Sequence, residues 1–209
     1  GVAGTVVVDT CTIGIDAAKR NAQILNEAGI QYLDSPVSGL KFRAEEGALV
    51  SMVSGAASEL KKARKLLEGY SRAVVHVGTE PGQGQRMKVL NNAICIASYV
   101  ISSEALTYGE AGGLKVREML EVINESSGQN FATKFLFPKY VATEQYDASG
   151  AEAHIIEKDI SLFVDGANGE GTPSKAIAAA YDVIKAFKDA DPLQDQMNIY
   201  PYVRGLHKD

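Results

Sequence analysis

The sequence has little from which to build a disulfide framework, a zinc site or a membrane span. Its 209 residues include two cysteines, Cys11 and Cys95, which are too few for such a framework and lack zinc-ligand spacing. The longest apolar run, residues 93–101, is far shorter than the roughly 20 residues that cross a bilayer. We predict unpaired cysteines in a reducing, cytoplasmic compartment, Cys11 as a small buried residue, no metal and no membrane contact.

Basic charge is also scarce. The chain has 21 basic and 26 acidic residues, which gives a formal net charge of −5 at pH 7. Because nonspecific nucleic-acid binding needs a basic surface, we predict no nucleic-acid partner. Apolar residues make up 45% of the chain, as is ordinary for a globular protein, and the length suggests one or two domains.

Strand and helix signals alternate over residues 1–81. Apolar, largely β-branched runs predict strands at residues 6–8, 30–33, 48–53 and 73–77, and helical spacing of apolar residues predicts helices at residues 16–28 and 58–67. Asp16 is a plausible N-cap of the first helix, and Gly29 suits its end. This alternation predicts an α/β domain with a parallel sheet over residues 1–81.

Strand signals stop after residue 82. Residues 87–111 read as one long helix that is apolar on most sides, which predicts a buried core helix. Further helices are predicted at residues 115–126, 130–145, 152–168 and 173–190, the last with Thr172 as cap and Pro173 in its first turn. Residues 191–209 read as loop and tail. The second predicted domain is therefore all-α and covers residues 82–209.

The segment from Gly82 to Asn92 carries the clearest chemical signal. Lys88 and Asn92 are four residues apart, so they lie on one face of the predicted helix. A lysine transfers protons when burial or a neighbouring cation lowers its pKa, and an asparagine offers a donor and an acceptor to a substrate.

Two other segments carry weaker signals. Ser38 and Gly39 follow a predicted strand, where a hydroxyl and backbone N–H groups can bind an anion, although an ordinary turn has the same pattern. Lys158 and Asp159 lie on a helical pattern far downstream and would alone indicate only a salt-bridged helix face.

Four segments in this order resemble the β-hydroxyacid dehydrogenase family, which includes 3-hydroxyisobutyrate dehydrogenase and, more distantly, 6-phosphogluconate dehydrogenase. Residues 9–13 resemble the family's D-x-S-T-I segment, and residues 34–39 resemble its D-A-P-V-S-G-G substrate loop. The pattern Gly82-x-Gly84-x-x-x-Lys88-x-x-x-Asn92 resembles its catalytic helix start, and Lys158-Asp159 its K-D motif.

The resemblance implies hydride transfer between NAD or NADP and a small 3-hydroxy acid. Lys88 would be general base in oxidation and general acid in reduction, and a homodimer or homotetramer would form on the long helix. The implied site residues are Lys88 and Asn92 for catalysis; Ser38, Gly39 and Thr12 for the substrate; and Thr12, Lys158 and Asp159 for the cofactor.

The chain departs from the family pattern in three places. It has no G-x-G-x-x-G turn for the dinucleotide pyrophosphate, so we expect the later part of a Rossmann-like domain, inactive alone, ahead of the helical domain. Leu40 replaces the family's second glycine, and Ile15 replaces its proline.

Three alternative functions remain. A 6-phosphogluconate dehydrogenase-like activity would use Lys41 and Arg43 for the phosphate. A dimerisation or binding module would keep the fold without turnover. An imine reductase is disfavoured by Lys88, since such enzymes usually replace that lysine.

Overall fold

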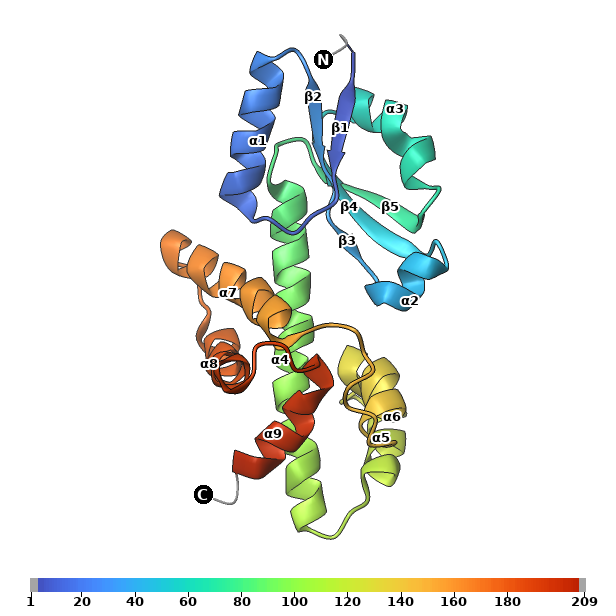
Figure 1. The fold of residues 1–209 in the computed structure, drawn as a ribbon, viewed down its shortest axis with the longest axis vertical. Coiled ribbons are helices and arrows are strands. Elements are labelled where there is room, and N and C mark those ends of the chain that lie inside the picture. The colour runs from blue at the N-terminus through green and yellow to red at the C-terminus, as the bar shows by residue number, and fades with distance from the viewer. Residues whose placement is uncertain (1–3, 207–209) are drawn as a thin grey trace. The chain divides into compact units, whose positions relative to one another are not determined.

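The computed structural model describes residues 4–206 and divides the chain into two compact units, Gly1–Asn91 and Asn92–Asp209 (Figure 1). The change from alternating strands and helices to helices alone falls at the start of α4 (Gln83–Ala111).

Within the described part, unit 1 has a five-stranded mixed sheet. Its strands are β1 (Val6–Asp9), β2 (Gln31–Asp34), β3 (Val37–Ser38), β4 (Leu49–Ser54) and β5 (Ser71–Gly78). β1 pairs with β2, and β4 with β5, in parallel, whereas β2 and β3 pair with β4 in antiparallel orientation. The predicted α/β domain and its parallel pairs are present, but two of the four strand pairings are antiparallel, so the sheet is mixed and not parallel throughout.

The reason is the connection between β3 and β4. Residues 39–48 contain only the short helix α2 (Leu40–Glu45), and a parallel pair needs a crossover of about a dozen residues or more. The chain reverses instead, so β3 runs antiparallel to β4.

One helix covers each face of the sheet next to β1 (Figure 1). Val6 and Val8 pack in a cluster with Leu60 and Leu67 of α3 (Ala57–Leu67). Val7 packs on the other face with α1 (Ile15–Glu27). This alternation follows from the two-residue period of a strand.

The helix α1 begins one residue earlier than predicted and is not capped by Asp16. The carbonyl of Gly14 accepts the first helical bond from Ala18 N–H at 3.2 Å, so Gly14 holds the cap position and Asp16 lies in the first turn.

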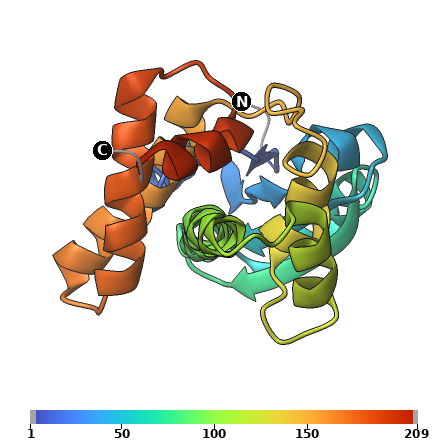
Figure 2. The same ribbon diagram turned by 90° about the horizontal axis from the view of Figure 1, so that it is seen from below.

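Unit 2 contains the rest of α4 and the remaining helices. They are α5 (Val116–Asn124), a π-helical turn η1 (Ala132–Leu136), α6 (Phe137–Tyr140), α7 (Ala153–Glu170), α8 (Lys175–Ala190), a 3-10 turn η2 (Gln196–Asn198) and α9 (Ile199–Gly205). α5 and α6 lie on one side of α4, and α7 and α8 on the other (Figures 1 and 2).

Two predictions about the C-terminal region are wrong. Residues 191–206 are not all loop, because Ile199, Tyr200 and Val203 bury one face of α9, and Pro201 lies in its first turn, where no donor is required; residues 207–209 lie outside the described part. Thr172 does not cap α8, since its N–H bonds to the carbonyl of Ala167 and closes the end of α7.

By length and composition, α4 could cross a membrane. Half of its most apolar 18-residue stretch is buried inside the chain, and core helices of other proteins meet the same criteria, so this is weak evidence for a span.

Candidate active site

A close approach of backbone segments fixes where α4 begins. A Cβ atom on Gly84 would lie 2.6 Å from the carbonyl oxygen of Met52 and 2.9 Å from that of Asp34. Only glycine fits there, so the first turn of α4 lies directly on the ends of β2 and β4.

This contact creates a buried polar network, called here the Asp34 network, of Asp34, Ser54, Gly84 and Gln85. The three side chains are fully buried. Asp34 Oδ2 accepts from Gln85 N–H at 2.9 Å and from Ser54 Oγ at 3.2 Å, and Ser54 Oγ accepts from Gly84 N–H at 2.9 Å. Asp34 Oδ1 accepts from Gln85 Nε2 at 2.7 Å.

Burial and hydrogen bonding act in opposite directions on Asp34. Burial raises the pKa of the carboxyl group, and the bonds from Gln85, Ser54 and Gly82 lower it, with a net rise. Loss of water around the carboxylate therefore outweighs its hydrogen bonds.

The Asp34 network also holds the segment that contains Thr12. Gln85 Oε1 accepts from the backbone N–H groups of Ile13 at 2.9 Å and Gly14 at 3.1 Å. Gln85 Nε2 donates to the carbonyl of Cys11 at 2.9 Å. Thr12, predicted to contact substrate and cofactor, lies half-buried between these fixed peptide groups.

Lys88 lies on α4 three residues after Gln85 and is only 9% exposed. The predicted proton-transfer group is therefore withdrawn from bulk water. Asn92 follows one helical turn later on the same helix, as the spacing predicted.

In unit 2, the carboxylate of Asp159 contacts two other predicted site residues, Asn92 and Lys158. Asn92 Nδ2 donates to Asp159 Oδ2 at 2.7 Å, and Lys158 Nζ lies 2.6 Å from Asp159 Oδ1. Asp159 is buried, whereas the Lys158 side chain is 49% exposed. Asp159 was predicted to bind the cofactor. In the structure, one of its carboxylate oxygens contacts Asn92 and the other contacts Lys158.

Ser38 and Gly39 lie at the end of β3 and the start of α2. Ser38 is paired with Val50 of β4, and Gly39 has φ 152°, with no room for a Cβ because it would lie 2.8 Å from Leu49 Cδ2. Leu40 follows with φ 59°, a left-handed conformation that costs a branched residue energy. The segment is thus held in a conformation that favours glycine at two consecutive positions.

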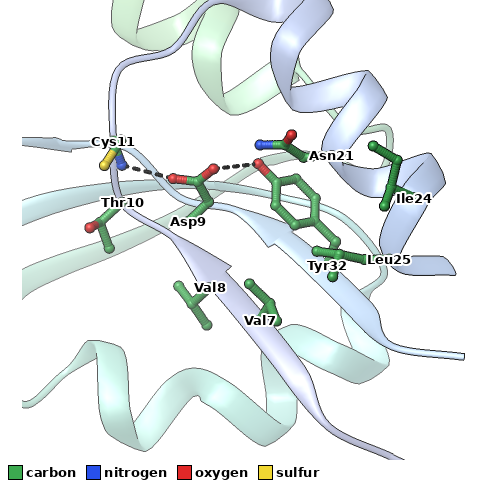
Figure 3. A pocket seen from close by; sticks show the side chains of 9 residues that line it. All are labelled: Val7, Val8, Asp9, Thr10, Cys11, Asn21, Ile24, Leu25 and Tyr32. Atoms are coloured by element: carbon green, nitrogen blue, oxygen red, sulfur yellow. Dashed lines mark hydrogen bonds between the residues drawn. The ribbon is translucent and has the colours of Figure 1, made fainter. Parts of the chain in front are cut away.

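A pocket of about 460 Å³ lies by β1 and α1 (Figure 3). Asp9 accepts from Tyr32 OH at 2.9 Å and from Cys11 N–H at 3.0 Å. Burial, followed by the bond to Asp9, raises the pKa of Tyr32. The lining residues are Val7, Val8, Asp9, Thr10, Cys11, Asn21, Ile24, Leu25 and Tyr32.

This pocket reaches the carboxyl end of β1, where open α/β sheets bind ligands. Its lining combines apolar side chains with the polar groups of Asp9 and Thr10. Cys11 is exposed there, so its predicted burial is wrong: the residue lies in the loop after β1, outside the sheet.

Among the described residues, no three His, Cys, Asp or Glu side chains are grouped as metal ligands.

Gln85 was given no role from the sequence pattern, although the sequence holds a signal for its burial. Gln85, Val89 and Ala93 are spaced at four-residue intervals on α4, and all three are buried. Because Val89 and Ala93 are apolar and lie on the same helical face as Gln85, the pattern predicts that Gln85 faces the interior. A buried amide requires hydrogen-bond partners.

Two protein-family models match this chain. The model described as NAD-binding of NADP-dependent 3-hydroxyisobutyrate dehydrogenase matches residues 82–203, more than half of the chain. The model described as the NAD-binding domain of 6-phosphogluconate dehydrogenase matches residues 2–78. The chain belongs to the β-hydroxyacid dehydrogenase family.

Individual relatives agree with this assignment. The chain is 34% identical over 182 residues to an NAD-dependent L-serine dehydrogenase of Pseudomonas aeruginosa, covering 84% of the chain and 61% of the relative. It is 30% identical over 183 residues to a 2-(hydroxymethyl)glutarate dehydrogenase of Eubacterium barkeri, covering 88% of the chain and 60% of the relative. The chain thus spans about three fifths of the length of these curated relatives.

A solved structure resembles the whole chain. The 3-hydroxyisobutyrate dehydrogenase of Mycobacterium tuberculosis, solved with L-serine, superimposes with a TM-score of 0.87 at 26% identity and covers 97% of this chain and 71% of its own. The mixed sheet followed by a helical unit with one long helix is thus the fold of this dehydrogenase family.

Proposed function

We propose that the protein is an NAD(P)-dependent oxidoreductase that transfers a hydride between the nicotinamide and a small 3-hydroxy acid. The observation that carries the proposal is the buried Lys88 on α4, one turn before an asparagine whose amide is held by Asp159. Burial disfavours the charged form of a lysine, which is the direction that proton transfer near neutral pH requires.

The names of three relatives support a narrower substrate class. L-serine, 3-hydroxyisobutyrate and 2-(hydroxymethyl)glutarate all carry a hydroxymethyl group on the carbon next to a carboxylate, and they differ in the third substituent. We propose that this hydroxymethyl acid unit is what the site recognises. Ser38 and Gly39 would bind the carboxylate, and Asn92 the hydroxyl.

The proposed roles around the cofactor follow the same arrangement. The bound nicotinamide accepts or gives the hydride. Thr12 would lie between the nicotinamide and the substrate, Lys158 would contact the cofactor, and Lys88 would take the hydroxyl proton as the carbonyl forms. Asp159 would act on Asn92 and Lys158 through the contacts seen.

Self-association through α4 is also part of the proposal. Ile94, Ile101 and Tyr108 are 63%, 59% and 85% exposed and follow one another at seven-residue intervals, so they form an apolar stripe on α4. A homodimer or homotetramer would cover it. The cytoplasmic location stays a prediction, since relatives include enzymes named as mitochondrial.

The test is kinetic and uses the intact polypeptide, with both nicotinamides against L-serine, 3-hydroxyisobutyrate, 2-(hydroxymethyl)glutarate and 6-phosphogluconate. We expect turnover of at least one hydroxymethyl acid, and Lys88→Ala should lower kcat about 100-fold or more. Lys61→Ala, which changes an exposed lysine of α3, is the matched control and should be neutral.

Three results would contradict the proposal. A loss of less than about tenfold in Lys88→Ala would remove Lys88 from proton transfer. Turnover of 6-phosphogluconate alone would favour the role of Lys41 and Arg43 in phosphate binding. Association without any turnover would favour a binding module.

A further inference from the structure

Gln85 uses every hydrogen-bonding position of its amide side chain on groups of unit 1. The two N–H donors go to Asp34 Oδ1 and the carbonyl of Cys11, and the oxygen accepts from Ile13 and Gly14. An amide has two donors and two acceptor positions, so this side chain is saturated. It has no capacity left for a substrate or cofactor.

Neither glutamate nor methionine can make this set of contacts. A glutamate has no donor when ionised and would bring a second carboxylate against Asp34 Oδ1, which lies 2.7 Å from the Gln85 nitrogen. A methionine has nearly the same length but can neither donate to Asp34 nor accept well from Ile13 and Gly14. The requirement is for a neutral group that donates on one side and accepts on the other.

The bonded groups lie on both sides of Thr12. The carbonyl of Cys11 precedes it, and the N–H of Ile13 follows it, so the one amide fixes both peptide groups that flank Thr12. Gln85 is itself fixed by Asp34, which accepts from both its backbone and its side chain. The Thr12 segment is thereby attached to the same helical turn that leads to Lys88.

We propose that Gln85 is a positioning residue that holds the Cys11–Gly14 segment against the first turn of α4, and so places Thr12 for the nicotinamide. This inference rests on the proposed function, because that function gives Thr12 its ligand. Gln85 itself touches neither substrate nor cofactor in this role.

The first measurement requires no cofactor. Amide hydrogen exchange is followed at Ile13 and Gly14 in the full chain, with amides of β4 as a record of folding. In Gln85→Met we expect the protection factors of Ile13 and Gly14 to fall about tenfold, as for loss of one hydrogen bond, while β4 stays protected. The matched control is Gln83→Met, because Gln83 lies two residues earlier on α4 and its side chain accepts only from Glu80 N–H among the bonds seen.

The second measurement is the nicotinamide dissociation constant of the same variants made in the intact polypeptide, from the fluorescence of the reduced cofactor. We expect it to rise about tenfold in Gln85→Met and to stay unchanged in Gln83→Met. Gln85→Glu should bind weakly at about pH 8 and recover towards wild type at about pH 5.5, where the two carboxyl groups can share a proton.

The outcomes separate the two proposals. Unchanged protection at Ile13 and Gly14 overturns the positioning role. Lower protection with an unchanged dissociation constant supports the attachment of the segment but overturns the assignment of Thr12 to the nicotinamide. If Gln85→Met does not fold, recovery of Gln85→Glu at low pH supports the positioning role, and equal binding at both pH values overturns it.

Discussion

Asp34 in unit 1 and Asp159 in unit 2 both hold predicted site residues, but in different surroundings. Asp34 is fully buried and bonds only neutral donors, and its pKa is raised. Asp159 also pairs with Lys158, a cation whose side chain is half-exposed.

The two carboxylates differ in how many buried donors would be left without an acceptor if the carboxylate were removed. Without Asp34, the donors of Gln85 and Ser54 stay buried, and each unsatisfied buried donor costs about 1–3 kcal/mol. Without Asp159, Lys158 can turn to water, so only Asn92 loses a fixed partner. The same type of contact therefore contributes unequally to stability.

The largest expected effect tests this inequality directly. Asp34→Ala should lower the free energy of unfolding by about 3 kcal/mol, because it leaves several buried donors without an acceptor. Urea unfolding followed by circular dichroism measures it. Asp16→Ala, at an exposed position in α1, is the control and should cost less than about 1 kcal/mol. Equal losses in the two variants would refute the network's contribution.

Asp159→Ala should cost only about 1 kcal/mol in the same assay, since its ion pair is partly exposed. Its main effect should be kinetic, a fall in kcat of about tenfold as the Asn92 amide loses its orientation. A destabilisation as large as that of Asp34→Ala would show that the two carboxylates contribute equally to stability.

Leu40→Gly should stabilise the protein by about 1 kcal/mol, because glycine adopts φ 59° without the cost that leucine carries. The matched control is Ala44→Gly in the same short helix, which should destabilise by about 1 kcal/mol. Thermal unfolding measures both. A loss in Leu40→Gly would mean that packing of the leucine outweighs its strain.

The smallest expected effect is the pH dependence of the contribution that Asp34 makes to the free energy of unfolding. Because its folded-state pKa lies above the unfolded value of 3.8, the folded state binds the proton more tightly, and the contribution of Asp34 to stability falls as pH rises through that raised pKa. The destabilisation by Asp34→Ala should therefore be larger at about pH 4 than at about pH 7. Urea unfolding of both proteins at the two pH values measures this difference. A larger destabilisation at about pH 7 than at about pH 4 would contradict a raised pKa.

Local patterns were sufficient for most elements and for the family. Runs such as Val6–Val8 and the continuous apolar helix after Gly84 depend on near neighbours, and β1 and α4 formed where these patterns indicated. The four motifs led to the family that the comparisons then showed. The roles of Thr12, Ser38 and Lys158 stay predictions.

The remaining features depend on contacts between distant parts of the chain, which no local pattern records. The direction of β3 follows from its pairing with β4, and α9 forms around Pro201 because Tyr200 and Val203 pack against a buried surface. Gln85 and Cys11 are 74 positions apart, and only the packing of α4 on the sheet brings their polar groups together. An amide's partners are set by geometry in three dimensions, whereas a helix or strand is already favoured by the residues beside it.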